Sequence, residues 1–235
     1  PNNAVLVIAG DFETKNTKKL IKGYFESIPA RTLPKRETIV EPERTQEKRV
    51  KEYDSNIQLP AILLAHKTPA MKERDAKVLD VISTILSNGK SSRLYKKLVD
   101  DKKKALQVFS FARNLEDYSV YNIGAIPLGK TSLEDLIKEM DEEILKLQTE
   151  LISDKDLQKV RNKFENNFVA SNSNVQGIAN SLARNYMLIG NTNNINKELE
   201  IVNSITKEEI RAVAKKYLAK DRRIVIEYLP ESKKK

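Results

Sequence analysis

The sequence predicts an α+β protein in which helices cover one face of a mostly antiparallel sheet, with a short N-terminal strand and helix set apart from it. Strand-like runs of apolar and β-branched residues occur in adjacent pairs between residues 49 and 126. Residues 127–205 are mainly helical in pattern, and a helix followed by a strand ends the chain. With 235 residues, 40% of them hydrophobic and 32% charged, the chain has a globular composition and is long enough for a sizeable core.

The N-terminal part is predicted to close a domain that precedes the main one. Residues 4–9 form a continuous apolar run, which suits a buried strand, and residues 14–25 carry apolar side chains at helical spacing. Several prolines and a dense mixture of charges then predict an extended linker. The predicted organisation is therefore a closing strand and helix of a truncated domain (1–29), a linker (30–46) and a main domain (47–235).

The elements of the main domain follow from periodicity and from capping residues. Strands are predicted at residues 49–53, 61–67, 105–113, 118–126 and 224–228, with the third and fourth joined by a turn at 114–117. Helices are predicted at residues 72–86, 91–101, 133–147, 153–168, 178–189, 194–203 and 206–219. Ser132 and Ser153 have N-cap chemistry, and Thr206 with Glu209 forms a capping box.

The two ends of the chain resemble each other. Asp221–Ile226 runs from a polar turn into an aliphatic strand, and Pro1–Leu6 has the same order of residue types. A duplicated architecture, in which the first copy is represented only by its end, explains the similarity most simply. Chance similarity between two short segments is the alternative.

Composition excludes several kinds of chemistry. The chain has no cysteine, so disulfides, thiolate nucleophiles and cysteine zinc sites are excluded, and the redox compartment stays open. The net charge of +9 suggests nucleic acid, but the basic residues are spread along the chain among acidic ones, so no nucleic-acid partner is expected. No apolar run approaches the roughly 18–20 residues that a membrane span needs, and the N-terminus has no secretory-signal pattern.

The segment Asn88–Lys97, with the sequence Asn-Gly-Lys-Ser-Ser-Arg-Leu-Tyr-Lys-Lys, carries the most specific signal. It resembles the substrate-binding half of the pitrilysin-type zinc metallopeptidases, and the resemblance covers nearly the whole chain. The Pro-Asn-Asn start is also typical of the point where the first half of such a peptidase closes. The resemblance implies that an H-x-x-E-H helix in the missing half, or in a partner subunit, binds zinc, and that both halves enclose an unfolded peptide.

The same resemblance implies catalytic and substrate-binding roles for Arg93 and Tyr95, and a substrate-binding role for Ser92. A tyrosine hydroxyl can donate to the oxygen of a reacting carbonyl, and a guanidinium can hold a neighbouring carbonyl or carboxylate. Residues i and i+2 lie about 200° apart on an α-helix, so the pair can face one point only in the first turn. Ser91 or Ser92 as N-cap would place it there. The alternative is a solvated Arg93 and a packed Tyr95.

The chain is expected to bind no metal and to be inactive alone, because His66 is its single histidine. A lone histidine on a strand without a second ligand at suitable spacing favours a structural role. Two alternatives to the peptidase-half function remain open at this stage. One is a non-catalytic scaffold or partner subunit of the same superfamily, and the other, less favoured, is a basic nucleic-acid-associated module.

Overall fold

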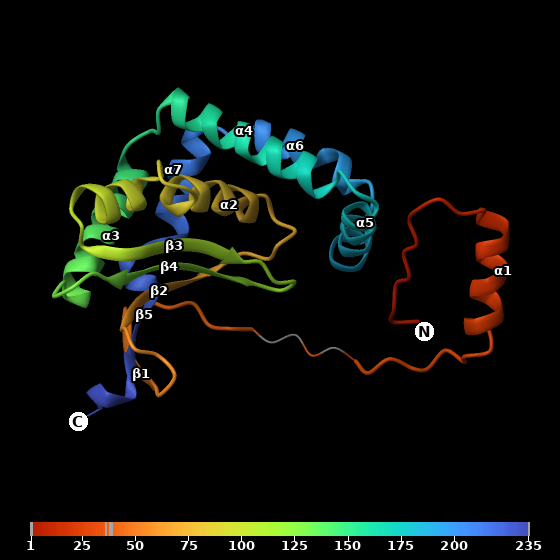
Figure 1. Ribbon diagram of the computed structural model, residues 1–235, viewed down its shortest axis with the longest axis horizontal. Helices are drawn as coiled ribbons and strands as arrows, with labels where there is room; N and C mark the ends of the chain where they lie inside the picture. Colours follow the sequence, from red (N-terminus) through yellow and green to blue (C-terminus); the bar gives the residue numbers. More distant parts are fainter. Residues whose placement is uncertain (1, 36, 38–39, 235) are drawn as a thin grey trace. The chain divides into compact units, whose positions relative to one another are not determined.

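The computed structural model describes residues 2–35, 37 and 40–234 and contains a five-stranded sheet (Figure 1). The spatial order is β1-β5-β2-β4-β3, with β1 and β5 parallel and every other pair antiparallel. The strands are β1 (Lys48–Asp54), β2 (Ala61–Thr68), β3 (Ala105–Arg113), β4 (Ser119–Pro127) and β5 (Arg223–Pro230). All five predicted strands of the main domain are confirmed, each to within two residues at either end.

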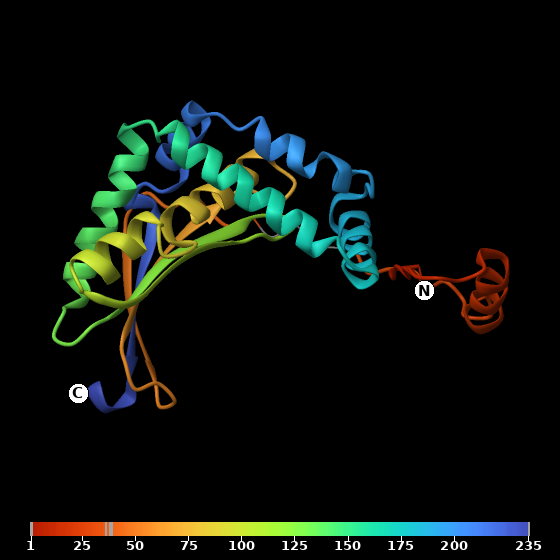
Figure 2. The same ribbon diagram turned by 45° about the horizontal axis from the view of Figure 1, so that its top comes forward.

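Helices cover one face of this sheet and leave the other face open, as Figure 2 shows. The covering helices are α2 (Arg74–Ser87), α3 (Leu133–Thr149) and α7 (Lys207–Tyr217). Burial alternates along β2, with Ile62 and Leu64 fully buried towards the helices and their neighbours half-buried on the open face. Each such aliphatic side chain contributes roughly 1.5–3 kcal/mol through removal from water. The predicted α+β class, with helices on one face, is therefore confirmed.

The remaining predicted helices are also present. They are α1 (Thr14–Phe25), α4 (Asp154–Ser171), α5 (Val175–Ile189) and α6 (Asn194–Asn203). The Ser132 hydroxyl accepts from the backbone N–H of Asp135, and Thr206 with Glu209 makes the predicted capping box of α7. Helix α5 is followed by Gly190, whose φ of +76° is a left-handed conformation that glycine adopts without a steric penalty.

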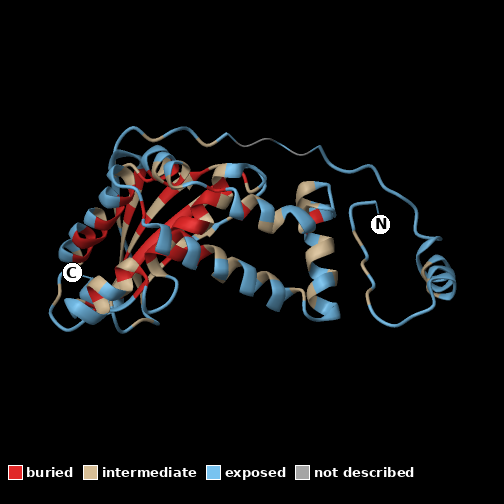
Figure 3. Ribbon diagram, turned by 90° about the horizontal axis from the view of Figure 1, so that it is seen from above, coloured by how far each residue is buried: buried red, intermediate tan, exposed pale blue. Residues whose placement is uncertain are grey.

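Residue contacts divide the chain into two compact units. The first comprises Pro1–Val40 and Phe164–Glu200, and the second comprises Glu41–Lys163 and Ile201–Lys235. The whole sheet and its three covering helices belong to the second unit, where nearly all buried residues lie between sheet and helices (Figure 3). Every residue of α1, in the first unit, is at least partly exposed. None of the described helices is long and apolar enough to cross a membrane.

The predicted strand at residues 4–9 is wrong. This segment is irregular in the structure, and Leu6 and Ile8 are 57% and 43% exposed. A strand needs a neighbouring strand to satisfy its backbone N–H and C=O groups, and no described strand pairs with this segment. The apolar run therefore has strand composition without the partner that would make it a strand.

A buried arginine joins β5 to the rest of the second unit. The side chain of Arg223 is 1% exposed, and its guanidinium donates to Glu47 at 2.8 Å and to both carboxylate oxygens of Asp141. A buried charge requires such pairing, because an unpaired one is strongly destabilising. The start of β5 is thereby fixed to α3 and to the residue just before β1.

At the edge strand β3, a serine side chain from α2 takes up backbone groups. The hydroxyl of Ser87 accepts from the backbone N–H of Ser110 at 2.6 Å and donates to its carbonyl oxygen at 3.3 Å. The two hydroxyl oxygens are also 2.9 Å apart. These contacts fasten the end of α2 to the edge of the sheet, immediately before the segment that carries the sequence motif.

Candidate functional site

The motif segment connects α2 to β3 and becomes helical at Arg93. From Tyr95 to Asp101 it is a π-helix, η1, in place of the ordinary short helix predicted for residues 91–101. The π-helix is rare and occurs frequently at functional sites. Leu94 and Leu98 are both fully buried and attach this helix to the body of the second unit.

Arg93 and Tyr95 lie on either side of the buried Leu94, and both side chains are half-buried. The pair stands at the first helical residues, where the i and i+2 spacing requires it to be. Within residues 2–35, 37 and 40–234, neither side chain makes a hydrogen bond or ion pair with another residue. Their polar groups are thus not committed to the fold of this chain.

Ser92 directly precedes the helix but does not cap it in the predicted way. Its carbonyl oxygen accepts from the backbone N–H of Lys96 at 2.9 Å, which is the first turn of the helix. Its hydroxyl, however, donates to the carbonyl oxygen of Gly89 at 2.6 Å. Because Ser92 is 2% exposed, this side chain serves to close the loop before the helix. Its predicted contact with substrate stays a prediction.

Two lysines of α4 hold the loop that precedes Arg93. Lys159 Nζ donates to the carbonyl and hydroxyl oxygens of Ser91 at 3.1 and 2.5 Å. Lys163 Nζ donates to the carbonyl and side-chain oxygens of Asn88 at 3.0 and 2.6 Å. These contacts join residues 68 and 75 positions apart in the sequence, so no local sequence pattern reveals them.

An ionic cluster holds the π-helix on its other side. Lys97 Nζ lies 2.8 Å from Glu142 and 3.2 Å from both Glu139 and Glu143 on α3. Glu139, whose side chain is 6% exposed, also binds Lys102 and Lys104. Burial alone would raise the pKa of Glu139, but the hydrogen bonds from Lys102, Lys104 and Lys97 outweigh it and lower the pKa to about 2. The Arg93–Tyr95 segment is therefore fixed at both ends.

His66 lies within β2, fully buried on the helix-covered face, as a structural histidine would. Burial and the positive charge of Arg223 lower its pKa to about 3, and a nearby backbone group of Tyr217 opposes the shift slightly. Neither ring nitrogen has a partner in hydrogen-bonding geometry. Across the described ranges there is no group of three or more His, Cys, Asp or Glu side chains placed to hold a metal.

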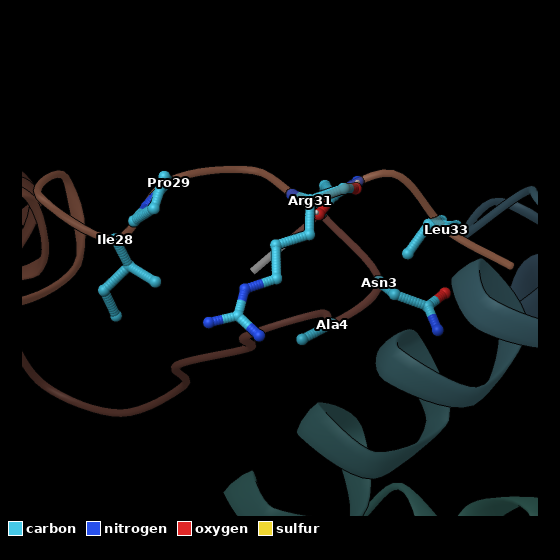
Figure 4. Close-up of a pocket in the computed structure, with 7 residues that line it drawn as sticks. Asn3, Ala4, Ile28, Pro29, Arg31 and Leu33 are labelled. Carbon is cyan, nitrogen blue, oxygen red and sulfur yellow. Dashed lines mark hydrogen bonds between the residues drawn. The ribbon is translucent and has the colours of Figure 1, made fainter.

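A hollow of about 380 Å³ occurs in the N-terminal segment of the first unit (Figure 4). Asn2 closes it by a paired contact, donating to the carbonyl oxygen of Arg31 at 2.9 Å and accepting from its backbone N–H at 3.2 Å. The lining combines apolar residues with one cation, Arg31, and offers no group suited to acid–base or nucleophilic chemistry. We therefore place the candidate site at Arg93 and Tyr95.

Comparisons with known proteins identify the type of domain. A family model described as the peptidase M16 inactive domain matches residues 1–164. The chain is 31% identical over 184 residues to zinc protease PqqE of Helicobacter pylori, covering 76% of this chain and 41% of that protein. The sequence motif at residues 88–97 lies within the region that the family model matches.

Solved structures share the fold. The crystal structure of a protease from Helicobacter pylori matches with a TM-score of 0.86 and 25% identity, over 94% of this chain and 54% of that one. A peptidase M16 inactive domain from Pseudomonas fluorescens matches with a TM-score of 0.77 and 16% identity, over 94% of this chain and 52% of the other. The chain spans about half the length of these relatives. It belongs to the peptidase M16 family, as an inactive C-terminal domain of zinc-protease-like proteins.

Proposed function

We propose that this chain is the substrate-binding half of a zinc-dependent endopeptidase, and that Arg93 and Tyr95 contact the peptide substrate. The zinc would be held by an H-x-x-E-H half that lies outside this chain. The match to the inactive domain supports this, since the sequence has a single histidine and no cysteine. The observation that carries the proposal is a pair of uncommitted hydrogen-bond donors on a segment fastened at both ends, in a domain of the inactive M16 type.

The chemistry of the two side chains suits a peptide in extended conformation. The Tyr95 hydroxyl would donate to the oxygen of the reacting carbonyl as that oxygen gains negative charge. Donors placed for a developing charge in this way stabilise the transition state more than the ground state. Arg93 would hold a neighbouring carbonyl or carboxylate through its planar fork of N–H groups. Tyr95 thus acts on kcat and Arg93 on substrate affinity.

The test is a peptidase assay of the whole two-half protein with Tyr95→Phe and Arg93→Ala. Loss of the Tyr95 hydroxyl is expected to lower kcat by about 100-fold, the usual cost of one such donor. Arg93→Ala is expected mainly to raise KM. Lys96→Ala is the matched control, because it removes an exposed cation from the same helical segment. Parent-like kinetics of both variants would contradict the assigned roles.

The same assay separates the peptidase from a non-catalytic scaffold. A whole protein that lacks peptide hydrolysis under zinc-replete conditions would place the chain in a scaffold or partner subunit instead. In that case Arg93 and Tyr95 would be tested in the assembled complex, by mixing this chain with the subunit that carries H-x-x-E-H. The peptidase proposal requires zinc-dependent hydrolysis in one of the two arrangements.

We further propose that residues 1–29 close a preceding domain, that 30–46 link the two and that 47–235 form the inactive domain. The support is the apolar side chains of the N-terminal segment, which find little cover within this chain. Leu20, Tyr24 and Phe25 of α1 are 61%, 75% and 50% exposed. A preceding domain of the same architecture would supply the strand partner and the apolar surface that this segment lacks.

A further inference from the structure

We propose that Lys159 and Lys163 are positioning residues for Arg93 and Tyr95, and that they act by clamping the loop from Asn88 to Ser92. This inference rests on the proposed function of Arg93 and Tyr95. The two lysines are four residues apart on α4, so their side chains lie on one face of that helix. Each one donates to both a backbone and a side-chain oxygen of the loop.

The loop needs an external support because it is not held by apolar packing. Residues 88–91 are all exposed, and only Ser92 is buried. Gly89 has a φ of +97°, which removes the loop from helical geometry at the end of α2. Without the lysines, the remaining hydrogen bonds within the loop are local turns among Ser87, Gly89 and Ser92. Local turns alone leave the loop itself loosely defined, although the buried Leu94 and Leu98 hold the helix that follows it.

The helix that carries the clamp is itself firmly placed. Leu157 and Val160 of α4 are 7% and 3% exposed and alternate with the clamping residues along the chain. Arg161 donates to the carbonyl oxygen of Ile205 at 3.1 Å, and Asp154 binds Lys207. The first half of α4 therefore provides a fixed base from which Lys159 and Lys163 reach the loop.

The acceptors explain why cations are used. Asn88 follows the last residue of α2, where the carbonyl oxygens lack helical partners and carry partial negative charge. With its three donors, the Lys163 ammonium satisfies the carbonyl oxygen and the side-chain oxygen of Asn88 at once. The two lysines donate to neutral oxygens of the loop and not to a carboxylate. These contacts therefore order the loop and do not neutralise an acidic side chain.

Loss of the clamp should affect the reaction rate more than the stability of the fold. The clamped oxygens belong to residues two to five positions before Arg93. A small displacement at this point moves Arg93 and Tyr95 together. Catalytic groups are sensitive to displacements of about 1 Å, which can reduce rates on the order of 100-fold. Loss of the clamp should therefore lower kcat while global unfolding changes little.

The first experiment tests the clamp in this chain alone, by amide hydrogen exchange of residues 88–95. The double variant Lys159→Met and Lys163→Met is expected to exchange on the order of tenfold faster in this segment, because its ordered population falls. Lys155→Met is the matched control, since Lys155 lies one turn earlier on the exposed surface of α4. Exchange equal to that of the control would overturn the clamp.

The second experiment tests positioning in the whole two-half protein through kcat, KM and a double-mutant cycle with Tyr95→Phe. The lysine double variant is expected to lose on the order of tenfold in kcat with little change in KM. The loss should shrink in the Tyr95→Phe background, because the clamp acts through that side chain. Lys→Arg replacements should recover part of the rate.

The outcomes separate the two proposals. If Tyr95→Phe lowers kcat but the lysine variants match Lys155→Met, the positioning role is wrong and the function stands. If Tyr95→Phe is as active as the parent, the proposed function fails, and hydrogen exchange alone decides whether the clamp exists. A kcat loss of equal size in both backgrounds would also overturn positioning through Tyr95.

Discussion

Residues 4–8 and strand β5 begin with the same order of residue types, and only β5 is a strand. Val225 of β5 is fully buried, and its backbone lies between β1 and β2. The corresponding residue of the N-terminal segment, Val5, is half-buried, and its neighbour Leu6 is 57% exposed. An aliphatic run therefore has a high β-propensity, but it forms a strand only where neighbouring strands can pair with it.

The largest effect should come from placing a charge at the two matched valines. Val225→Asp buries an unpaired carboxylate at the centre of the sheet and is expected to cost more than about 4 kcal/mol, enough to prevent folding. Val5→Asp should change the unfolding free energy by less than about 0.5 kcal/mol, as surface substitutions do. Urea unfolding followed by circular dichroism measures both. Equal effects would show that residues 4–8 are packed in solution.

The next comparison concerns the residues just before each aliphatic run, Arg223 and Asn3. Arg223→Ala removes the buried cation that Glu47 and Asp141 share and leaves them only their partly or largely exposed partners Arg49 and Lys220. It is expected to destabilise the fold by about 2–3 kcal/mol. This is below the usual cost for a fully buried pair, because both carboxylates are partly exposed. Asn3→Ala should leave the same transition unchanged. Chemical denaturation at neutral pH is the measurement. If Arg223→Ala has the same unfolding free energy as the parent, these ion pairs do not hold β5 in place.

The free energy of unfolding should depend on pH through His66, which lies opposite Arg223 in the pairing of β2 with β5. Its pKa falls from an ordinary value of 6.5 to about 3 on folding, so the unfolded chain binds more protons between these values. The fold therefore loses stability as pH falls below about 6.5, by about 2 kcal/mol at pH 5. His66→Gln should remove this part of the pH dependence. Parallel pH curves for parent and variant would contradict it.

The smallest effect should follow removal of residues 2–40. The described residues of this segment contribute no strand to the sheet, and the contacts of Lys67 with Glu41 and Glu43 are kept. The unfolding free energy of the remaining chain is expected to change by less than about 0.5 kcal/mol. Thermal unfolding of the shortened chain provides the check. A drop of several degrees would mean that the N-terminal segment packs on the inactive domain.

Most elements could be predicted from the sequence because their signals are local. Alternation marks β2, and the capping box of Thr206 and Glu209 marks the start of α7. The prediction at residues 4–9 was wrong because pairing is a property of the partner strand and not of the run itself. The π-helix was missed since the change from i+4 to i+5 bonds leaves Leu94 and Leu98 at ordinary helical spacing.

The candidate site could be predicted only in part. The motif located Arg93 and Tyr95, and their substrate roles stay predictions. The contacts that Lys159, Lys163 and Lys97 make could not be predicted, because their partners lie 42 or more residues away in the sequence. Lysines at i and i+4 on a polar helix face usually contact only solvent, so the sequence offers no signal that distinguishes a clamp.

The contacts between Ser87 and Ser110 also bear on how separate copies of the chain meet. An edge strand with exposed apolar side chains, such as Leu106 and Phe111 of β3, is a common starting point for aggregation through added strands. A further strand would need an uninterrupted row of free backbone groups along β3. The hydroxyl of Ser87 already occupies the N–H and carbonyl of Ser110, and the register shift between Ala105 and Gln107 disturbs the row again. A second chain therefore cannot add a continuous hydrogen-bonded strand along this edge.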